Sequence, residues 1–365
     1  EVLPTMVVQR GGGPVSLLDS APMPEIADVV ATTDLGTMPL SDALADPRSR
    51  MQGIAVLHEG KIVYETYPGM PPGMPHIWNS ASKTITGLMV YLLAEEGLVD
   101  LKAPVSTYLD FTKGSPIGAA AVENVLHQRS GLDFEETQAN FKNPDHPLGQ
   151  ALATAMTARG VPIGPGVRDF VTDVSAHRAP NTAFEYSSFN TQILGFIVEA
   201  VTNRPWNRVV GERLWTKAGM QGDGLLALSA AGEGLYAGGF ASTLRDFARY
   251  ALLFTPSWNA VATERVVPET YLETVYAAVN PDIYRVAFQG QRMVKAFGED
   301  DAPIGTSYQW DAIFEDGDLY KAGLGGQAIY VSPETDTVVV YFSTTWQNSL
   351  SMISYARAIV KQKFR

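Results

Sequence analysis

The hydrophobic pattern divides the chain into a strand-rich beginning, a helix-rich middle and a strand-rich end. Two apolar runs in GIAVLHEGKIVYETY (53–67) flank Glu59-Gly60, which predicts a β-hairpin. Near the other end, the runs GGQAIYVS and TVVVYFST are separated by the turn PETD, which predicts a second hairpin. Between these hairpins the pattern is mostly that of short helices and loops.

Helices are predicted where apolar residues recur at the i, i+3, i+4 spacing of one helical face. The first covers 80–96 and has a stop signal in Gly97. Further helices are expected over 120–132, 188–202, 244–254 and 349–364.

These elements predict an α+β fold in which the two distant hairpins share one antiparallel sheet, flanked by helices. A chain of 365 residues exceeds the ~250–300 residues at which a single core stops growing. We expect an irregular N-terminal extension over 1–50, a sheet domain built from 51–100 and 225–365, and a mainly helical domain over 101–224.

Composition narrows the classes of function. The net charge of -12 and the absence of a Lys/Arg run argue against a nucleic acid partner. The chain has no cysteine, which excludes disulfides, thiolate catalysis and zinc–thiolate sites. No apolar run approaches the ~20 residues needed to span a bilayer. The first residue is Glu1 rather than Met, which suggests that a leader or tag has been removed.

Ser80 and Lys83 form the first candidate for chemistry, at the start of the predicted helix 80–96. A spacing of three places both side chains on one helical face, with their Cβ atoms ~5–6 Å apart. A nucleophilic serine needs a base and an oxyanion donor, and a helix N-terminus offers backbone N–H groups. The lysine can serve as the base if burial destabilises its ammonium. The alternative is a serine N-cap followed by a lysine whose head reaches solvent.

Two later segments offer partners for this pair. Tyr186 precedes the predicted helix 188–202, and its phenol can pass a proton between a serine and a lysine; a neighbouring ammonium would favour the phenolate. The alternative is a packed aromatic. The glycines of YKAGLGGQAIYVS (320–332) lead into a strand, unlike those of a dinucleotide-binding loop, and the strand edge can supply a second oxyanion donor.

Other hydrolase and metal motifs are missing from the sequence. It contains neither a Gly-x-Ser-x-Gly elbow nor a His-Glu-x-x-His motif, and its five histidines are scattered. Neither an α/β-hydrolase triad nor a metal site is therefore predicted.

The three motifs, in this order, resemble those of the serine β-lactamase-related family, which includes class C β-lactamases, DD-peptidases, family VIII esterases and 6-aminohexanoate-dimer hydrolases. The resemblance covers about 50–365 and rests on these segments: NSASKTITGLMVYLLAEEG, VENVLHQRSGLDFEE, NTAFEYSSFNTQILGFIVEAV and YKAGLGGQAIYVS. It implies that Ser80 is the acylated nucleophile and that Lys83 and Tyr186 handle its proton. The implied oxyanion hole consists of the N–H groups of Ser80 and Leu324. No metal and no organic cofactor is implied.

Two departures from the family pattern point away from β-lactam chemistry. The tyrosine motif reads Tyr186-Ser187-Ser188 where lactamases and DD-peptidases have Tyr-x-Asn, so an amide contact to substrate is lost. The third motif reads Lys-Ala-Gly instead of Lys-Thr-Gly or His-Thr-Gly, which removes a hydroxyl that helps to hold a substrate carboxylate. Both features resemble the esterase and aminohexanoate-hydrolase branch.

Further residues are candidates for substrate contacts. Four belong to the second and third motifs: Ser188, Lys321, Gly323 and Gly325. Five aromatic residues are candidate pocket walls, with core packing as an equal alternative: Trp78, Phe134, Tyr236, Trp310 and Trp346.

The expected function is a serine hydrolase that forms an acyl-enzyme with a small ester or amide, as a carboxylesterase or a 6-aminohexanoate-oligomer amidase. One alternative is a class C-like β-lactamase or D-amino-acid peptidase, and another is a catalytically silent binding or sensor protein of the same fold. We expect a soluble bacterial protein whose only implied partner is its small substrate; the compartment (periplasmic, secreted or cytoplasmic) and the oligomeric state are left open.

Overall fold

A six-stranded antiparallel sheet joins segments from the two ends of the chain in this computed structural model, which describes residues 4–143, 145–148, 166–171, 174–229, 231–345 and 350–365. Its strand order is β5–β4–β12–β11–β10–β9, and the pairing of β12 with β4 brings the two predicted hairpins together. The expected α+β fold is therefore confirmed. The strands are β4 (Met51–His58), β5 (Lys61–Thr66), β9 (Ala312–Ile313), β10 (Leu319–Gly323), β11 (Gln327–Ser332) and β12 (Thr337–Ser343).

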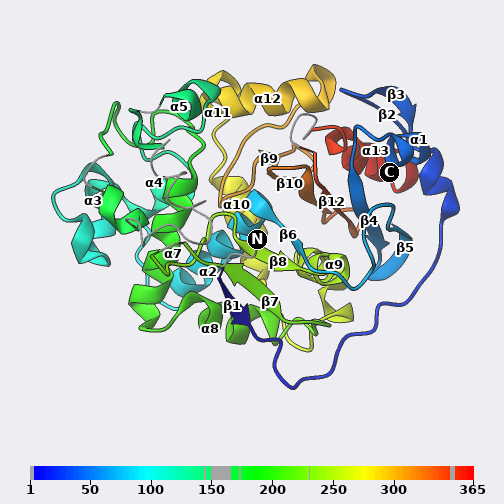
Figure 1. Ribbon diagram of the computed structural model, residues 1–365, viewed down its shortest axis with the longest axis horizontal. Helices are drawn as coiled ribbons and strands as arrows, with labels where there is room; N and C mark the ends of the chain where they lie inside the picture. The colour runs from blue at the N-terminus through cyan, green and yellow to red at the C-terminus, as the bar shows by residue number, and fades with distance from the viewer. Residues whose placement is uncertain (1–3, 144, 149–165, 172–173, 230, 346–349) are drawn as a thin grey trace.

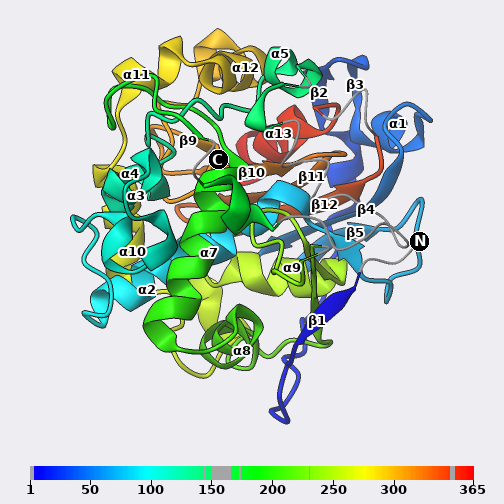
Figure 2. The same cartoon turned by 60° about the vertical axis from the view of Figure 1, so that its left-hand side comes forward.

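Both faces of this sheet are covered, because successive residues of a strand point to opposite sides. In β12, Val338 and Val340 belong to one hydrophobic cluster, which includes α9 (Leu244–Leu252). Val339, between them, belongs to a second cluster with α13 (Ile353–Lys363). Figure 2 shows α13 above the sheet and α9 below it. A strand buried on both faces reads as a continuous apolar run, as TVVVYF does.

A second sheet has the order β1–β7–β8–β6. Its strands are β1 (Thr5–Val8), β6 (His76–Ile77), β7 (Gly224–Ala227) and β8 (Phe240–Ser242).

The N-terminal segment also contains η1 (Pro24–Asp28), β2 (Val30–Thr33), β3 (Gly36–Pro39) and α1 (Leu40–Ala45), with β2 and β3 paired. The expectation of irregular structure over 1–50 is wrong for these elements. The β1 strand is stabilised by backbone pairing with β7, more than 200 residues away, which local periodicity does not reveal.

The regular elements that the structure describes between β6 and β7 are all helical, and Figure 1 shows α3, α4, α5 and α7 at the left, away from β4 and β5 at the right. The helix predicted over 188–202 is confirmed as α7 (Ser188–Thr202). The helix predicted over 120–132 is wrong in extent: α4 ends at Leu126, and Gln128 (φ 59°) and Gly131 (φ 74°) adopt left-handed backbone conformations. The expected domain boundaries stay a prediction.

The remaining described helical elements are short. Before β7 they are η3 (Val105–Thr107), η4 (Asp110–Thr112), α3 (Pro116–Ala119), α4 (Val122–Leu126), α5 (Gln138–Lys142), η5 (Val167–Phe170), α8 (Trp206–Val210) and η6 (Gly211–Trp215). After α9 they are η7 (Pro256–Ala260), α10 (Glu269–Ala277), α11 (Pro281–Val286), α12 (Phe288–Phe297) and η8 (Glu299–Asp301).

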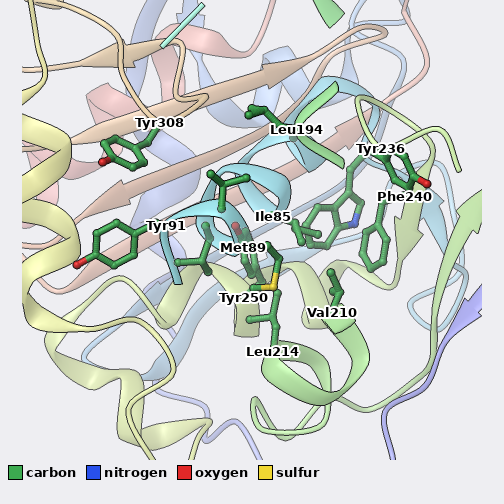
Figure 3. Close-up of a cluster of buried hydrophobic side chains, with 14 of the residues drawn as sticks. Ile85, Met89, Tyr91, Leu194, Val210, Leu214, Tyr236, Phe240, Tyr250 and Tyr308 are labelled. Carbon is green, nitrogen blue, oxygen red and sulfur yellow. The ribbon is translucent and has the colours of Figure 1, made fainter. Parts of the chain in front are cut away.

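The predicted helix 80–96 forms the centre of the molecule. It begins as a 3-10 turn, η2 (Asn79–Ser82), and continues as α2 (Lys83–Glu95), which is buried on nearly all sides. Figure 3 shows Ile85 and Met89 of α2 packed among side chains of other elements, including Leu214 and Tyr250. A helix that is apolar all round is an interior helix. Its first turn is therefore held in a fixed position by the core.

Candidate active site

Ser80 and Lys83 lie together where η2 passes into α2. The Lys83 Nζ is 3.1 Å from the Ser80 Oγ. The Lys83 side chain is fully buried, whereas Ser80 is partly exposed. A partly exposed serine is thus paired with a fully buried lysine, and the two side chains meet, as the spacing of three predicted.

Two further acceptors fix the orientation of the Lys83 amine. Its Nζ donates to the Ser188 Oγ at 2.8 Å, from the first turn of α7, and to the Ala237 carbonyl oxygen at 2.6 Å, between β7 and β8. An ammonium has three N–H donors, which these two acceptors and Ser80 can satisfy. A neutral amine has only two N–H donors and one lone pair. With Ser188 and Ala237 accepting both, the lone pair faces the Ser80 hydroxyl.

Burial makes the neutral amine accessible near neutral pH. Desolvation, with a smaller contribution from the Lys321 ammonium, lowers the pKa of Lys83 to about 7, and the carboxylates of Glu136 and Asp311 oppose that shift. A lysine with a pKa near 7 is partly in the neutral form at physiological pH, whereas an ordinary surface lysine is almost fully protonated.

Tyr186 completes the group that the sequence predicted. Its phenol lies within hydrogen-bonding reach of the Ser80 side chain. Its ring centroid is 5.3 Å from the Lys83 Nζ and 4.6 Å from the Lys321 Nζ, and the Lys321 Nζ approaches the phenol oxygen to 3.4 Å. Ser80, Lys83 and Tyr186 therefore meet, although more than 100 residues separate the tyrosine from the other two.

The protonation state of Tyr186 differs from the sequence-based expectation of a phenolate. Burial raises the pKa of this phenol well above its usual value, and the carboxylates of Asp311 and Glu136 raise it further. The hydrogen bond from Ser80 and the charge of Arg292 only partly oppose this. Tyr186 is thus a neutral phenol, able to donate a proton. The expectation considered a neighbouring cation but not desolvation, which acts against any charged form.

The start of the β10–β11 turn lies against η2. The Asn79 Nδ2 donates to the Leu324 carbonyl oxygen at 2.5 Å, and the Gln327 Nε2 donates to the same oxygen at 2.8 Å. Within the described part of the chain, the backbone N–H groups of Ser80 and Leu324 have no carbonyl acceptor. This arrangement is compatible with an oxyanion hole formed by these two groups, and their role stays a prediction.

Two charged residues at the site were missed by sequence reasoning. The Asp311 Oδ1 lies 2.5 Å from the Lys321 Nζ, and the Glu136 Oε1 accepts a 2.5 Å hydrogen bond from the backbone N–H of Ser188. Asp311 interrupts the aromatic and apolar run YQWDAIF, which is a usable signal for a buried functional carboxylate. No comparable signal distinguishes Glu136 from its neighbour Glu135.

The candidate substrate contacts fall into two groups. Ser188, Lys321, Gly323 and Gly325 lie in the motifs that meet at Ser80. The structure favours core packing for the aromatic candidates, because each of the following side chains is at most 2 % exposed: Trp78, Phe134, Tyr236 and Trp310. Trp346 lies outside the described residues.

Neither a membrane helix nor a metal cluster emerges from the described residues. No helix among them is long and apolar enough to cross a bilayer. No group of three or more His, Asp or Glu side chains in the same part of the chain is arranged to hold a metal ion.

The chain is similar in sequence and in fold to known proteins. A 6-aminohexanoate-dimer hydrolase of Paenarthrobacter ureafaciens is 27% identical over 311 residues, covering 84% of this chain and 76% of the relative. A solved candidate 6-aminohexanoate-dimer hydrolase from Bacillus anthracis has a TM-score of 0.79 at 22% identity, covering 99% of this chain and 90% of the other. EstCE1, a hydrolase with promiscuous acyltransferase activity, has a TM-score of 0.65 at 15% identity, covering 88% and 98%. Both structures share this fold.

The family model described as beta-lactamase matches residues 42–362, which is most of the chain. That match includes all three motifs around Ser80. The protein therefore belongs to the β-lactamase family of serine hydrolases.

Proposed function

We propose that this protein cleaves a small ester or amide through an acyl-enzyme at Ser80, as a carboxylesterase or a 6-aminohexanoate-oligomer amidase. The observation that carries the proposal is the 3.1 Å contact between the Ser80 hydroxyl and the fully buried Lys83 amine, whose pKa burial lowers to about 7. A serine activated in this way is a nucleophile near neutral pH.

The acylation step is derived from the two groups that contact the Ser80 hydroxyl, the Lys83 amine and the Tyr186 phenol. The Ser80 Oγ attacks the substrate carbonyl carbon while its proton moves to the lone pair of Lys83. The carbonyl oxygen becomes an oxyanion, which the N–H groups of Ser80 and Leu324 would stabilise. Two fixed acceptors, the Ser188 hydroxyl and the Ala237 carbonyl, keep the amine oriented during this transfer.

Collapse of the tetrahedral intermediate breaks the bond to the leaving alcohol or amine, which needs a proton. The neutral phenol of Tyr186 is the donor, and the Lys83 ammonium restores its proton. Water then attacks the acyl carbon in the reverse sense, with the same groups accepting and returning protons. The acid leaves, and Ser80 regains its hydrogen.

Two features support an ester or open-chain amide over a β-lactam. The hydroxyl of Ser188 is engaged by the Lys83 amine, so the position where lactamases present an asparagine amide offers a shorter group already in use. A 6-aminohexanoate dimer is joined by an open-chain amide, so the relative named as a 6-aminohexanoate-dimer hydrolase also favours an amide over a β-lactam as the substrate.

The first test compares hydrolysis of p-nitrophenyl butyrate by the wild type, Ser80→Ala and Ser41→Ala, because Ser41 is an exposed serine remote in sequence from the motifs. We expect a loss of ~10³-fold or more in kcat/KM for Ser80→Ala and little change for Ser41→Ala. Equal rates for the wild type and Ser80→Ala would refute the proposal.

Two further measurements address the remaining alternatives. The first separates a hydrolase from a silent binding protein, and the second separates a preference for esters from a preference for amides. A fluorophosphonate probe followed by mass spectrometry should label Ser80, whereas an inactive site would remain unlabelled. Linear 6-aminohexanoate dimer and nitrocefin, assayed beside the ester, then rank amide, β-lactam and ester turnover by kcat/KM.

A further inference from the structure

Gln128 holds the backbone on both sides of Tyr186. The Glu185 N–H donates to the Gln128 carbonyl oxygen at 2.9 Å, and the Ser187 N–H donates to the Gln128 side-chain Oε1, also at 2.9 Å. Glu136 adds a third contact, because its N–H donates to the Tyr186 carbonyl oxygen at 2.9 Å. The backbone from which the phenol projects is therefore fixed at Tyr186 and at both of its neighbours.

The Gln128 amide has one orientation in this arrangement. Its Oε1 accepts from the Ser187 N–H, which can only donate, so its Nε2 points the other way and donates to the Gln309 Oε1 at 2.9 Å. The Gln309 Nε2 donates in turn to the Leu126 carbonyl oxygen at 2.8 Å, and that oxygen can only accept. Backbone groups at the two ends of this pair of amides thus dictate the direction of both.

The amide pair is buried and has an unusual backbone conformation. Gln128 and Gln309 are 2% and 1% exposed, and their φ angles of 59° and 72° lie in the left-handed region that non-glycine residues rarely adopt. Two side chains of α7 add hydrogen bonds: the Asn190 Nδ2 to the Gln128 Oε1 at 3.0 Å, and the Thr191 Oγ1 to the Gln309 Oε1 at 2.7 Å. Such conformations persist only where the surrounding contacts enforce them.

Gln309 connects the amide pair to the helix that carries Lys83. A Cβ at Gly87 of α2 would be 2.6 Å from the Tyr308 carbonyl oxygen and 3.2 Å from the Gln309 Cγ, so this part of the chain lies directly on α2. Gly87 is four residues after Lys83 and therefore on the same face of the helix. The two amides thus link the segment that carries Tyr186 to the helix of the candidate base.

We infer that Gln128 is a positioning residue: together with Gln309, it sets where the Tyr186 phenol lies relative to Ser80. This inference rests on the proposed hydrolase function, in which the phenol gives its proton to the leaving alcohol or amine. A displacement of ~1 Å at a catalytic group costs about 10²-fold in rate. Loss of the Gln128 amide therefore impairs protonation of the leaving group more than attack by Ser80.

Two butyrate esters with different leaving groups test the inference. A 4-nitrophenolate departs as a stable anion without a proton, whereas the more basic trifluoroethoxide depends on protonation as it leaves. Gln128→Met keeps the length of the side chain but removes the amide. We expect it to lower kcat/KM for trifluoroethyl butyrate at least about tenfold more than for 4-nitrophenyl butyrate, with the circular dichroism spectrum retained.

Tyr186→Phe should show the same selective loss, because it removes the phenol itself. The double variant, Gln128→Met with Tyr186→Phe, should then be no worse than Tyr186→Phe alone, since Gln128 acts through the phenol. If Gln128→Met does not fold, Gln309→Met makes the same comparison, because it removes the partner amide of the pair.

Thr112→Val is the matched control for the loss of a buried hydrogen bond. The fully buried Thr112 hydroxyl donates to the Leu109 carbonyl oxygen at 2.7 Å, outside this arrangement. Its removal should leave the ratio of the two kcat/KM values unchanged.

The inference is overturned if Gln128→Met lowers kcat/KM for both esters by the same factor or lowers neither. It is also overturned if the full effect of Gln128→Met persists when Tyr186 is already phenylalanine. Ser80→Ala with the 4-nitrophenyl ester judges the proposed hydrolase function separately, because the nucleophile is needed for both leaving groups.

Discussion

Gly323 of β10 lies directly against the backbone of Trp78: a Cβ on Gly323 would be 2.2 Å from the Trp78 carbonyl oxygen. No side chain fits into that space, so only glycine lets β10 approach the turn that carries Ser80. The same contact brings Leu324, the expected second oxyanion donor, to the Asn79 side chain. The position of β10 relative to the nucleophile thus depends on a residue without a side chain at position 323.

Gly323→Ala should therefore impair catalysis more than folding. The added methyl group must push β10 away from η2, and a displacement of ~1 Å at a catalytic group costs about 10²-fold in rate. We expect a loss of that order in kcat/KM for p-nitrophenyl butyrate, with the circular dichroism spectrum retained. Gly73→Ala is the control, because a Cβ there meets nothing within 4 Å. Full activity in Gly323→Ala would contradict the proposed role of this close approach.

The acylation rate should rise with pH through the neutral range. Lys83, whose pKa burial lowers to about 7, accepts a proton only as the neutral amine, which forms above that pH. Tyr186 stays protonated over the same range, because burial raises its pKa well above the usual value. We expect kcat/KM for the ester to reach half of its plateau near pH 7. A profile that is flat from pH 6 to pH 9, or that falls across it, would remove Lys83 as the base.

The same burial predicts a pH-dependent effect of Lys83 on stability. The pKa of Lys83 is about 7 in the folded protein and ~10.4 in an unfolded chain, so between these values the unfolded state binds more protons. The free energy of unfolding therefore rises with pH in this window, by up to about 1.4 kcal/mol per pH unit. Lys83→Met lacks this contribution.

Urea unfolding of the wild type and Lys83→Met at pH 7 and pH 9.5 measures this pH-dependent contribution to the free energy of unfolding. Any stability advantage of Lys83→Met should shrink at the higher pH. Lys102→Met is the matched control, because the Lys102 side chain is 80% exposed, and its difference from wild type should not follow this trend. A constant difference between wild type and Lys83→Met would show that the lysine is not buried as an amine.

A charge network around Arg357 of α13 should affect stability without affecting chemistry. Arg357 of α13 contacts three carboxylates, those of Asp301, Asp316 and Asp318, and the Asp318 side chain is fully buried. Removing the arginine leaves that carboxylate with Arg365 and the Tyr330 hydroxyl as its remaining partners, so Arg357→Ala should lower the free energy of unfolding by up to about 3–5 kcal/mol. Lys361→Ala, which removes a half-exposed ammonium paired with Asp301, should cost under ~1 kcal/mol.

Chemical denaturation compares the two variants, and esterase activity per folded molecule should be unchanged in both. A loss for Arg357→Ala no larger than that for Lys361→Ala would mean that the network adds nothing beyond its surface pairs.

The elements that were predicted well are those whose signal is local. The α7 helix matches its predicted bounds because a long amphipathic pattern specifies a helix without reference to distant residues. The Ser80–Lys83 contact is likewise a consequence of helical spacing within one turn. In contrast, β1 could not be predicted from its own four residues, because it is defined by its pairing with β7.

The aromatic residues show why burial is hard to predict from composition. Trp78 and Trp310 are equally suited to a pocket wall and to a core, and only the packing of elements from distant parts of the chain encloses them. Asp311 is the reverse case. Its carboxylate is visible as an unusual charge in an apolar run, but its partner Lys321 is known only once β9 and β10 are paired.

The amino-acid sequence alone determined the α+β class, the order of the three motifs and the local geometry of the Ser80–Lys83 turn, because these depend on neighbours within a few residues. The tertiary structure decided the protonation states and charges of the site. The Ala237 carbonyl beside Lys83, the neutral phenol of Tyr186 and the pairing of Lys321 with Asp311 all depend on desolvation and on contacts between segments distant in sequence. Desolvation is a property of the packed interior, and no single stretch of sequence carries it.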